Sequence, residues 1–336
     1  MITHVHIQNF RSFLDAKVDL QPFSLVVGAN GSGKTNFLRF FEVLSHQVRR
    51  KAHARTDVFV GIHESFPWIR HTNLQDQPMF LRILTSDPLD ITGGFDKADG
   101  GVKLSTSLPN DGQGVQMYNL VPDVITGIEP IKPAAEVGPS GIGATQVLDI
   151  LKNGDREELF EEIESHLKQY VPEVEKLSLQ TVKQGFKQIQ VREKGLNKPT
   201  PGPELSEGTR LILAILTILH QEKPPPIILL EDIDRGMHPR LFEYMAPLMK
   251  DIAVRMDVNI IATTHNPYLV DAFQDDKKAV IIVEKEDGAS TLTTLEDKLE
   301  GLNYDEVNPD DLPLGQLWYS GLVGGVPKKI DLATKA

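Results

Sequence analysis

The sequence contains no cysteine among its 336 residues. Disulfides, zinc–thiolate sites, iron–sulfur clusters and thiol nucleophiles are therefore excluded. No apolar run approaches the roughly 18 to 20 residues that a membrane helix requires. The N-terminus, MITHVHIQNFRSF, lacks the basic segment and following apolar stretch of a secretory signal. We therefore expect a soluble, cytoplasmic protein with no membrane partner.

Basic residues are too few to outweigh the acidic ones. Lys and Arg number 35 and Asp and Glu number 47, which gives a formal net charge of -12 at pH 7. This balance excludes a protein that coats nucleic acid through its overall charge, although a local basic patch remains possible. The most basic cluster, at 49–55, could contact a DNA backbone. We favour a solvated helix end, where the helix dipole attracts Lys and Arg.

With 40% hydrophobic residues, the chain can bury a sizeable core, and its apolar pattern predicts an α/β fold. Strands are predicted at 16–20, 23–27, 177–182, 186–191, 227–230, 259–264 and 279–284, and helices at 36–48, 155–170, 207–220, 241–256 and 268–273. Strands alternate with helices in the C-terminal half, which favours a mostly parallel sheet. Residues 57–145 are rich in Gly, Pro, Asp and Thr, which indicates an irregular β-rich stretch. We expect a core built from 1–56 and 200–336, with a β-rich and helical region inserted at 57–199.

A glycine-rich loop joins the buried strand at 23–27 to the helix that follows. Residues 28–35, GANGSGKT, fit the pattern G-x-x-x-x-G-K-[ST] in the strand–loop–helix context that the motif requires. Glycines let backbone N–H groups turn inward around a phosphate chain, and the helix N-terminus adds partial positive charge. Lys34 would reach the β- and γ-phosphates, and the Thr35 hydroxyl would hold Mg²⁺. The predicted nucleotide-binding residues of this loop are Gly28, Asn30, Gly31, Ser32, Gly33, Lys34, Thr35 and Asn36.

Two acids follow the apolar strand at 227–230. In parallel sheets the ligand crevice lies at the carboxyl ends of the strands. Glu231 and Asp232 would suit Mg²⁺ coordination and the activation of an attacking water there, and a solvated acidic loop is the alternative. His265 ends the next strand at the same edge. It is well placed to sense a γ-phosphate, although a lone histidine is more often structural.

The segment Leu205–Arg210 stands at the head of an apolar helix. Ser206 is a good N-cap, whereas Gly208 is costly inside a helix. A glycine is tolerable in a first helical turn where another group must approach the backbone closely. Taken alone, the segment favours a simple helix cap.

Taken in order, these motifs resemble the ATP-binding-cassette (ABC) type of P-loop ATPase, specifically its RecF, SMC and OLD branch. The resemblance rests on Ile7–Phe13 as the opening strand, Leu205–Thr209 as the signature motif, Asp234–Pro239 as the E-x-G-L-H-P loop, Thr264–Pro267 as the switch-histidine segment, and Leu314–Gly321, which is similar to a family of stand-alone predicted ATPases. It implies a P-loop NTPase fold of the ABC-ATPase head type, whose mostly parallel sheet is joined by an antiparallel β subdomain.

The resemblance also implies an ATPase that converts ATP and water to ADP and phosphate, with ATP and Mg²⁺ as cofactors. Thr35 and Glu231 would be metal ligands, and Asp232, Glu231 and His265 would be catalytic. A head-to-tail homodimer would sandwich ATP, so that Ser206 and the backbone near Gly208 of one chain face the phosphate held by the other chain. DNA repair, recombination or defence against mobile elements is the implied setting.

One departure from the family pattern concerns the acids. The family has Asp then Glu, followed by Pro, whereas this chain has Glu231, Asp232 and Ile233. Asp232 is one methylene shorter than the usual Glu, so we expect slow hydrolysis and a long-lived ATP dimer. An alternative function is an ATP-gated binding module that holds or releases a nuclease or toxin effector. A third is a DNA clamp that touches DNA through the insertion or the cluster at 49–55.

Several family features are weak or missing in this sequence. About 70 residues follow His265 and lack a spaced acidic cluster, so we expect no TOPRIM nuclease in this chain. A coiled-coil tether and coupling to a transporter are not expected either. Gln77 is a candidate for the Q-loop, but an ordinary loop glutamine is favoured. Trp318 and Tyr319 could dock a partner, although a C-terminal segment anchored by its aromatic residues is favoured.

Overall fold

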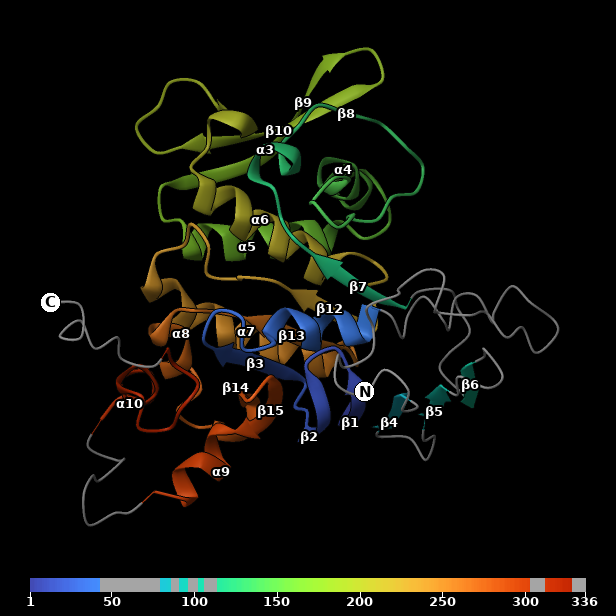
Figure 1. The fold of residues 1–336 in the computed structure, drawn as a ribbon. Helices are drawn as coiled ribbons and strands as arrows, with labels where there is room; N and C mark the ends of the chain where they lie inside the picture. The colour runs from blue at the N-terminus through green and yellow to red at the C-terminus, as the bar shows by residue number, and fades with distance from the viewer. Residues whose placement is uncertain (43–78, 86–90, 96–101, 106–113, 303–311, 328–336) are drawn as a thin grey trace, which may run out of the picture. The chain divides into compact units, whose positions relative to one another are not determined.

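The structure is a computed structural model that describes residues 1–42, 79–85, 91–95, 102–105, 114–302 and 312–327; between 79 and 105 only the backbone is described (Figure 1). The chain forms two compact units. The first comprises Met1–Val115 and Asn259–Ala336, and the second comprises Gln116–Val258. Both ends of the chain therefore contribute to the first unit.

The first unit contains a largely parallel sheet centred on β3 (Phe23–Gly28). β13 (Asn259–Thr263) and β14 (Val280–Glu286) run parallel to β3 on either side of it. β15 (Ala289–Thr294) pairs antiparallel with β14. All residues of β3 are buried, which explains its continuous apolar sequence. These strands confirm the prediction of a mostly parallel sheet.

An antiparallel sheet forms the second layer of strands in the first unit. β1 (Ile2–Phe10) pairs with β2 (Phe13–Asp19) on one side and with β4 (Met79–Thr85) on the other. The sheet continues through β5 (Ile91–Phe95) to β6 (Val102–Ser105). This sheet confirms the predicted antiparallel β subdomain.

Helices of the first unit pack around these strands. They include a helix at 34–42, α8 (Pro267–Asp271), the 3₁₀ turn η4 (Lys277–Ala279), α9 (Leu295–Glu300) and α10 (Leu314–Ser320). The helix at 34–42 buries Phe37 and Phe41, whose rings meet edge to face at 5.3 Å. In α10, Trp318 is 4% exposed and Tyr319 is 74% exposed, so the C-terminal segment is anchored through one aromatic residue and not both.

The second unit is built around α6 (Glu207–His220), whose apolar residues are almost all buried. α6 packs against α4 (Ala144–Asn153) and α5 (Glu157–Tyr170) (Figure 1). The remaining helical elements include α3 (Pro122–Ile125), α7 (Phe242–Arg255) and the 3₁₀ turns η2 (Gly202–Glu204) and η3 (Pro239–Leu241). The prediction of a helix at 207–220 is confirmed residue by residue, whereas α4 was not predicted.

Two groups of strands belong to the second unit. β9 (Val174–Lys183) and β10 (Phe186–Glu193) form the predicted hairpin, and β10 also pairs with the short strands β8 (Glu129–Pro130) and β11 (Thr200–Pro201). β12 (Ile227–Leu230) has the predicted bounds, is fully buried and lies beside β7 (Val115–Tyr118). The sequence analysis predicts a core at 1–56 and 200–336 with an insertion at 57–199. This prediction divides the chain at other residues than the two units do, and it stays a prediction. Among the described residues, no helix is both long and apolar enough to span a membrane.

Candidate nucleotide-binding and catalytic segments

The phosphate loop follows β3, and the helix at 34–42 begins at its last residues. Gly33 has φ +123°, a backbone conformation that a side chain would strain. A Cβ added to Gly33 would lie 2.6 Å from the Ser290 hydroxyl and 3.1 Å from the Ser12 hydroxyl. A Cβ added to Gly28 would collide with the carbonyl of Val283. Glycine is therefore required at both fixed positions of the motif.

The polar groups of the loop match the needs of a phosphate chain. Lys34 is buried, and its Nζ donates hydrogen bonds to the carbonyl oxygens of Gly28 (2.8 Å) and Ala29 (3.0 Å). The Ser32 hydroxyl is buried and has no hydrogen-bond partner among the described residues. Phosphate oxygens would accept from this hydroxyl, from the ammonium group and from the N–H groups at the helix start. The loop residues therefore fit a nucleotide phosphate.

Residues outside the motif hold the loop in this shape. Arg11 donates from Nη1 to the Asn36 side-chain oxygen (3.1 Å), and Asn36 donates from Nδ2 to the Ser12 hydroxyl (3.0 Å). Ser290 donates from its amide to the Ser12 carbonyl (2.6 Å) and from its hydroxyl to the Ser32 carbonyl (2.5 Å). The turn between β1 and β2 and the start of β15 therefore brace the loop from two sides.

Burial, with a smaller contribution from Arg39, lowers the pKa of Arg11, because both disfavour the charged guanidinium, and Glu42 opposes them. No sequence pattern indicates a role for Ser290, which lies in the edge strand β15. Arg11 and Ser12 lie within the opening strand of the family resemblance, but their contacts with Asn36 appear only in the structure.

An open hollow of about 610 Å³ lies against the phosphate loop. It is lined by Ala29–Ser32, Val283–Glu286, Gly288, Thr291 and Gly325–Pro327. This volume falls within the range of small-molecule and cofactor sites, which is about 300–1,000 Å³. The residues at 325–327 were not predicted to lie here. They follow α10, and the packing of α10 brings them to the phosphate loop.

The switch-histidine segment follows β13 in the same unit. The Thr264 amide donates to the carbonyl of Val26 in β3 (3.2 Å), and the Asn266 amide donates to the Thr264 hydroxyl (2.9 Å). His265 lies between these two residues and is exposed. Because β3 and β13 are parallel neighbours, His265 and the phosphate loop follow the same edge of the sheet.

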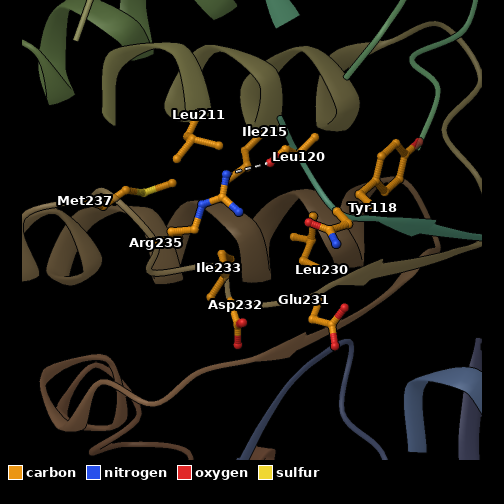
Figure 2. A pocket seen from close by; sticks show the side chains of 11 residues that line it. Tyr118, Leu120, Leu211, Ile215, Leu230, Glu231, Asp232, Ile233, Arg235 and Met237 are labelled. Atoms are coloured by element: carbon orange, nitrogen blue, oxygen red, sulfur yellow. Dashed lines mark hydrogen bonds between the residues drawn. The ribbon is translucent and has the colours of Figure 1, made fainter. Parts of the chain in front are cut away.

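The acidic loop, at 231–238, follows β12 in the second unit. Glu231 is half-buried, and its amide donates to the carbonyl of Tyr118 (3.2 Å). Asp232 is exposed and has φ +49°, an uncommon conformation for a residue with a side chain. The Arg235 amide donates to the Asp232 carbonyl (3.0 Å) and closes the turn. Figure 2 shows both carboxylates on the side of the loop that faces away from α6.

The signature segment caps α6. The Ser206 hydroxyl accepts from the Thr209 amide (3.1 Å) and lies 2.8 Å from the Thr209 hydroxyl, so Ser206 is the N-cap. A Cβ on Gly208 would lie 2.6 Å from the carbonyl oxygen of Gly236. The close approach that a glycine at this position suggests is therefore made by the acidic loop of the same unit.

The structure thus groups the predicted residues within each unit. The phosphate loop, Thr35 and His265 belong to the first unit, and Ser206, Gly208 and the two acids belong to the second. Gln77 and the cluster at 49–55 lie outside the described residues. The described residues contain no group of three His, Asp or Glu side chains that could hold a metal. Magnesium is commonly bound through one or two carboxylates together with substrate phosphates, and the carboxylates of Glu231 and Asp232 are the kind of ligand that this mode uses.

Two family models match separate parts of the chain. Residues 1–119 match the model described as "AAA ATPase domain", and residues 146–271 match the model described as "AAA domain, putative AbiEii toxin, Type IV TA system". A curated relative, the OLD nuclease of Thermus scotoductus, is 22% identical over 346 residues. The alignment covers 85% of this chain, and the chain spans 65% of the length of that relative.

Solved structures of SMC heads share the fold. An SMC head bound to the C-winged helix domain of ScpA matches with a TM-score of 0.58 and 16% identity, over 89% of this chain and 99% of that one. A head with an extended coiled coil from Pyrococcus furiosus, bound to the C-terminal domain of ScpA, matches with a TM-score of 0.53 and 14% identity, over 89% and 98%. The SMC head of Thermotoga maritima matches with a TM-score of 0.50 and 15% identity, over 87% of this chain and 98% of that one. Together with the sequence matches, these likenesses support a P-loop ATPase of the RecF, SMC and OLD type.

Proposed function

We propose that this chain binds ATP with Mg²⁺ and hydrolyses it to ADP and phosphate as a head-to-tail homodimer. The observation that carries the proposal is the phosphate loop: a buried Lys34, a buried Ser32 hydroxyl with no hydrogen-bond partner in the described part of the chain, and glycine enforced at positions 28 and 33. The neighbouring hollow has the volume that a nucleotide needs. The matches to AAA models, the OLD relative and SMC heads support an ATPase in general.

The proposal gives each motif residue a role. Lys34 and the loop amides bind the phosphates, and Thr35 and Glu231 hold Mg²⁺. The bound ion would neutralise charge that develops on the phosphate oxygens. Asp232 accepts the proton of the attacking water, whose oxygen bonds to the γ-phosphorus as the bond to the ADP oxygen breaks. His265 contacts the γ-phosphate.

In the dimer, Ser206 and the backbone near Gly208 of one chain complete the site of the other. This pairing rests on the order of the motifs and on the exposed position of Ser206 at the start of α6. A helix N-terminus carries partial positive charge, which suits an anion held by a partner chain. ATP then favours the dimer by mass action, and hydrolysis releases it.

Steady-state hydrolysis measured against protein concentration tests the proposal. The natural chain, Lys34→Ala and Asp232→Asn are compared, with Lys223→Ala in an exposed loop as the matched surface control. We expect a rate per chain that rises with concentration, loss of nucleotide binding in Lys34→Ala, and binding without turnover in Asp232→Asn. A natural chain that binds no more ATP than Lys34→Ala overturns the proposal.

The geometry of Asp232 favours a second candidate, an ATP-gated binding module with very slow turnover. Asp232 is shorter than the glutamate of the family pattern and sits in a left-handed turn. Both features restrict where its carboxylate can reach. A stable ATP-bound dimer with turnover below a few per minute would favour the module, and an Asp232→Glu variant that turned over no faster would remove this explanation.

The biological setting is also a proposal. The names of the matched family and of the OLD nuclease relative agree with defence against mobile elements, or with DNA repair and recombination. A separately encoded effector protein is the partner that this setting suggests. A DNA clamp is the third candidate: DNA binding that requires ATP and weakens steeply with salt would support it.

A further inference from the structure

The acidic loop is attached to the end of β7 at two points that lie on either side of Asp232. Before it, the Glu231 amide donates to the Tyr118 carbonyl (3.2 Å). After it, the Arg235 guanidinium donates from Nη2 to the Leu120 carbonyl (3.2 Å). Asp232 therefore lies between two hydrogen bonds that join the loop to the carbonyl groups of Tyr118 and Leu120.

The second of these attachments is made by a side chain that crosses the loop. Figure 2 shows the Arg235 guanidinium turned toward α6 and Leu120, away from the two carboxylates. A cavity of about 140 Å³ lies beside it, lined also by Leu211, Ile215 and Met237. The hydrogen bond to Leu120 is the contact through which the Arg235 side chain joins the loop to the segment after β7.

The backbone of the loop needs such a contact. Asp232 has φ +49°, and residues with side chains are held in this region at a cost of about 1–3 kcal/mol by the surrounding structure. The turn itself contributes the bond from the Arg235 amide to the Asp232 carbonyl (3.0 Å). Arg235 thus holds the turn twice, once through its backbone and once through its side chain.

We propose that Arg235 is a positioning residue that fixes Asp232 for proton acceptance by pinning the acidic loop to the Leu120 carbonyl. This inference rests on the proposed function, because it assumes that Asp232 takes the proton of the attacking water. In this role Arg235 acts through the loop, by way of the Leu120 carbonyl. Nothing in the family motif requires an arginine here, so the role belongs to the contacts of this chain.

A second contact of Arg235 is weaker. Its Nε lies 3.5 Å from Oε1 of Glu207, and the two side chains are 50% and 49% exposed. Ion pairs this exposed contribute little, so the side-chain hold on the loop comes from the Leu120 carbonyl. Lys223→Ala, which removes an exposed positive charge in another loop, is the control for the loss of a basic side chain.

The first experiment compares the kinetics of Arg235→Ala, Arg235→Lys and Lys223→Ala. We expect Arg235→Ala to lower kcat about 10-fold or more while the KM for ATP stays within about twofold. The variant loses a hydrogen bond from a charged donor at the acidic loop and loses none at the phosphate loop. Arg235→Lys should recover part of kcat, and Lys223→Ala should stay within about twofold of the natural chain. An unchanged kcat in Arg235→Ala, or a loss in KM alone, overturns the proposal.

A double-variant cycle separates positioning from general damage. If Arg235 acts through Asp232, the slow residual single-turnover rates that remain in Asp232→Asn and in Asp232→Asn with Arg235→Ala should agree within about twofold. Additive losses contradict the inference. If the natural chain binds ATP no better than Lys34→Ala, the proposed function fails, and that result is distinct from an active chain in which Arg235 has no effect.

Hydrogen exchange provides a readout without turnover. Amides at 232–237 should exchange about 10-fold faster or more in Arg235→Ala than in the natural chain, with Lys223→Ala unchanged and with exchange at 177–191 unaffected. Equal exchange at 232–237 in Arg235→Ala and in the natural chain means that the side chain does not fix the loop, and this overturns the inference whatever the rate of hydrolysis.

Discussion

The carbonyl oxygen of Gly236 lies 2.6 Å from the point where a side chain on Gly208 would begin. The signature segment and the acidic loop therefore meet backbone to backbone, with no room for a methyl group between them. Gly236 itself has φ +68°, so both partners in this contact depend on the absence of a side chain.

This contact predicts that Gly208→Ala disturbs the acidic loop as well as the cap of α6. We expect a loss of about 1–3 kcal/mol in the free energy of unfolding, because the added Cβ meets a backbone carbonyl that cannot rotate away. Urea unfolding measures the loss. Gly127→Ala is the control, since its added Cβ would lie 3.4 Å from its nearest neighbour, the carbonyl of Val124. Equal stability of the two variants would mean that the two segments do not constrain each other.

The hydroxyl of Ser290 predicts an effect on nucleotide binding from outside every motif. Ser290→Ala removes the bond to the Ser32 carbonyl and one brace of the phosphate loop. We expect ATP affinity to fall about 5-fold, as for the loss of one buried hydrogen bond of about 1 kcal/mol. Isothermal titration calorimetry measures the change. Ser178→Ala, which loses a longer bond to the Gln190 carbonyl, should leave the affinity unchanged.

Burial of His220 predicts a dependence of stability on pH. Desolvation lowers the pKa of His220, because the charged imidazole is disfavoured inside the unit; His166 and Arg255 act in the same direction, and Glu162 and the Leu216 carbonyl oppose them. The unfolded chain takes up the proton near its ordinary value of about 6.5, whereas the folded chain does so at lower pH. The contribution of His220 is therefore complete above pH 6.5 and is lost as the pH falls toward the folded pKa.

Urea unfolding between pH 8 and pH 5 measures this loss. His220→Asn should show a flatter profile over that interval, because the amide can still donate to the Leu216 carbonyl but does not take up a proton. Parallel profiles for the variant and the natural chain would assign the pH dependence to other groups.

The two aromatic residues of α10 are expected to differ in how much each stabilises the fold. Trp318→Ala should lower the free energy of unfolding by about 3–5 kcal/mol, since the indole is buried, whereas Tyr319→Ala should stay within about 0.5 kcal/mol. Thermal unfolding compares them. A large loss in Tyr319→Ala would show that its ring packs against something in solution.

Local pattern was enough to predict the elements whose packing is dictated by their own sequence. The helix at 207–220 begins at Ser206, which caps it, and ends before a run of prolines, so both bounds were visible. The continuous apolar run of β3 and the motif after it fixed the phosphate loop in the same way. Local pattern failed for α4, which starts after the left-handed Gly143 and has no side-chain cap.

Contacts between distant residues could not be predicted. Nothing near Ser290 in the sequence indicates that its hydroxyl reaches Ser32, and nothing near Leu120 indicates that its carbonyl accepts from Arg235. These contacts depend on how strands and loops come together, which residue types alone do not determine. The candidate site was thus predicted as a set of motif residues, while the groups that hold those residues came from the fold.

The brace around the phosphate loop has a consequence for how the protein is made. Its central strand, β3, is complete by residue 28, but both strands that pair with it come after residue 258, and Ser290 comes later still. Synthesis must therefore pass residue 290 before the loop can acquire these neighbours. Pairings of such long sequence separation form slowly, so a nascent chain carries the motif long before it has a binding site. Nucleotide binding by a nascent chain would therefore indicate that its synthesis has passed the strands that pair beside β3.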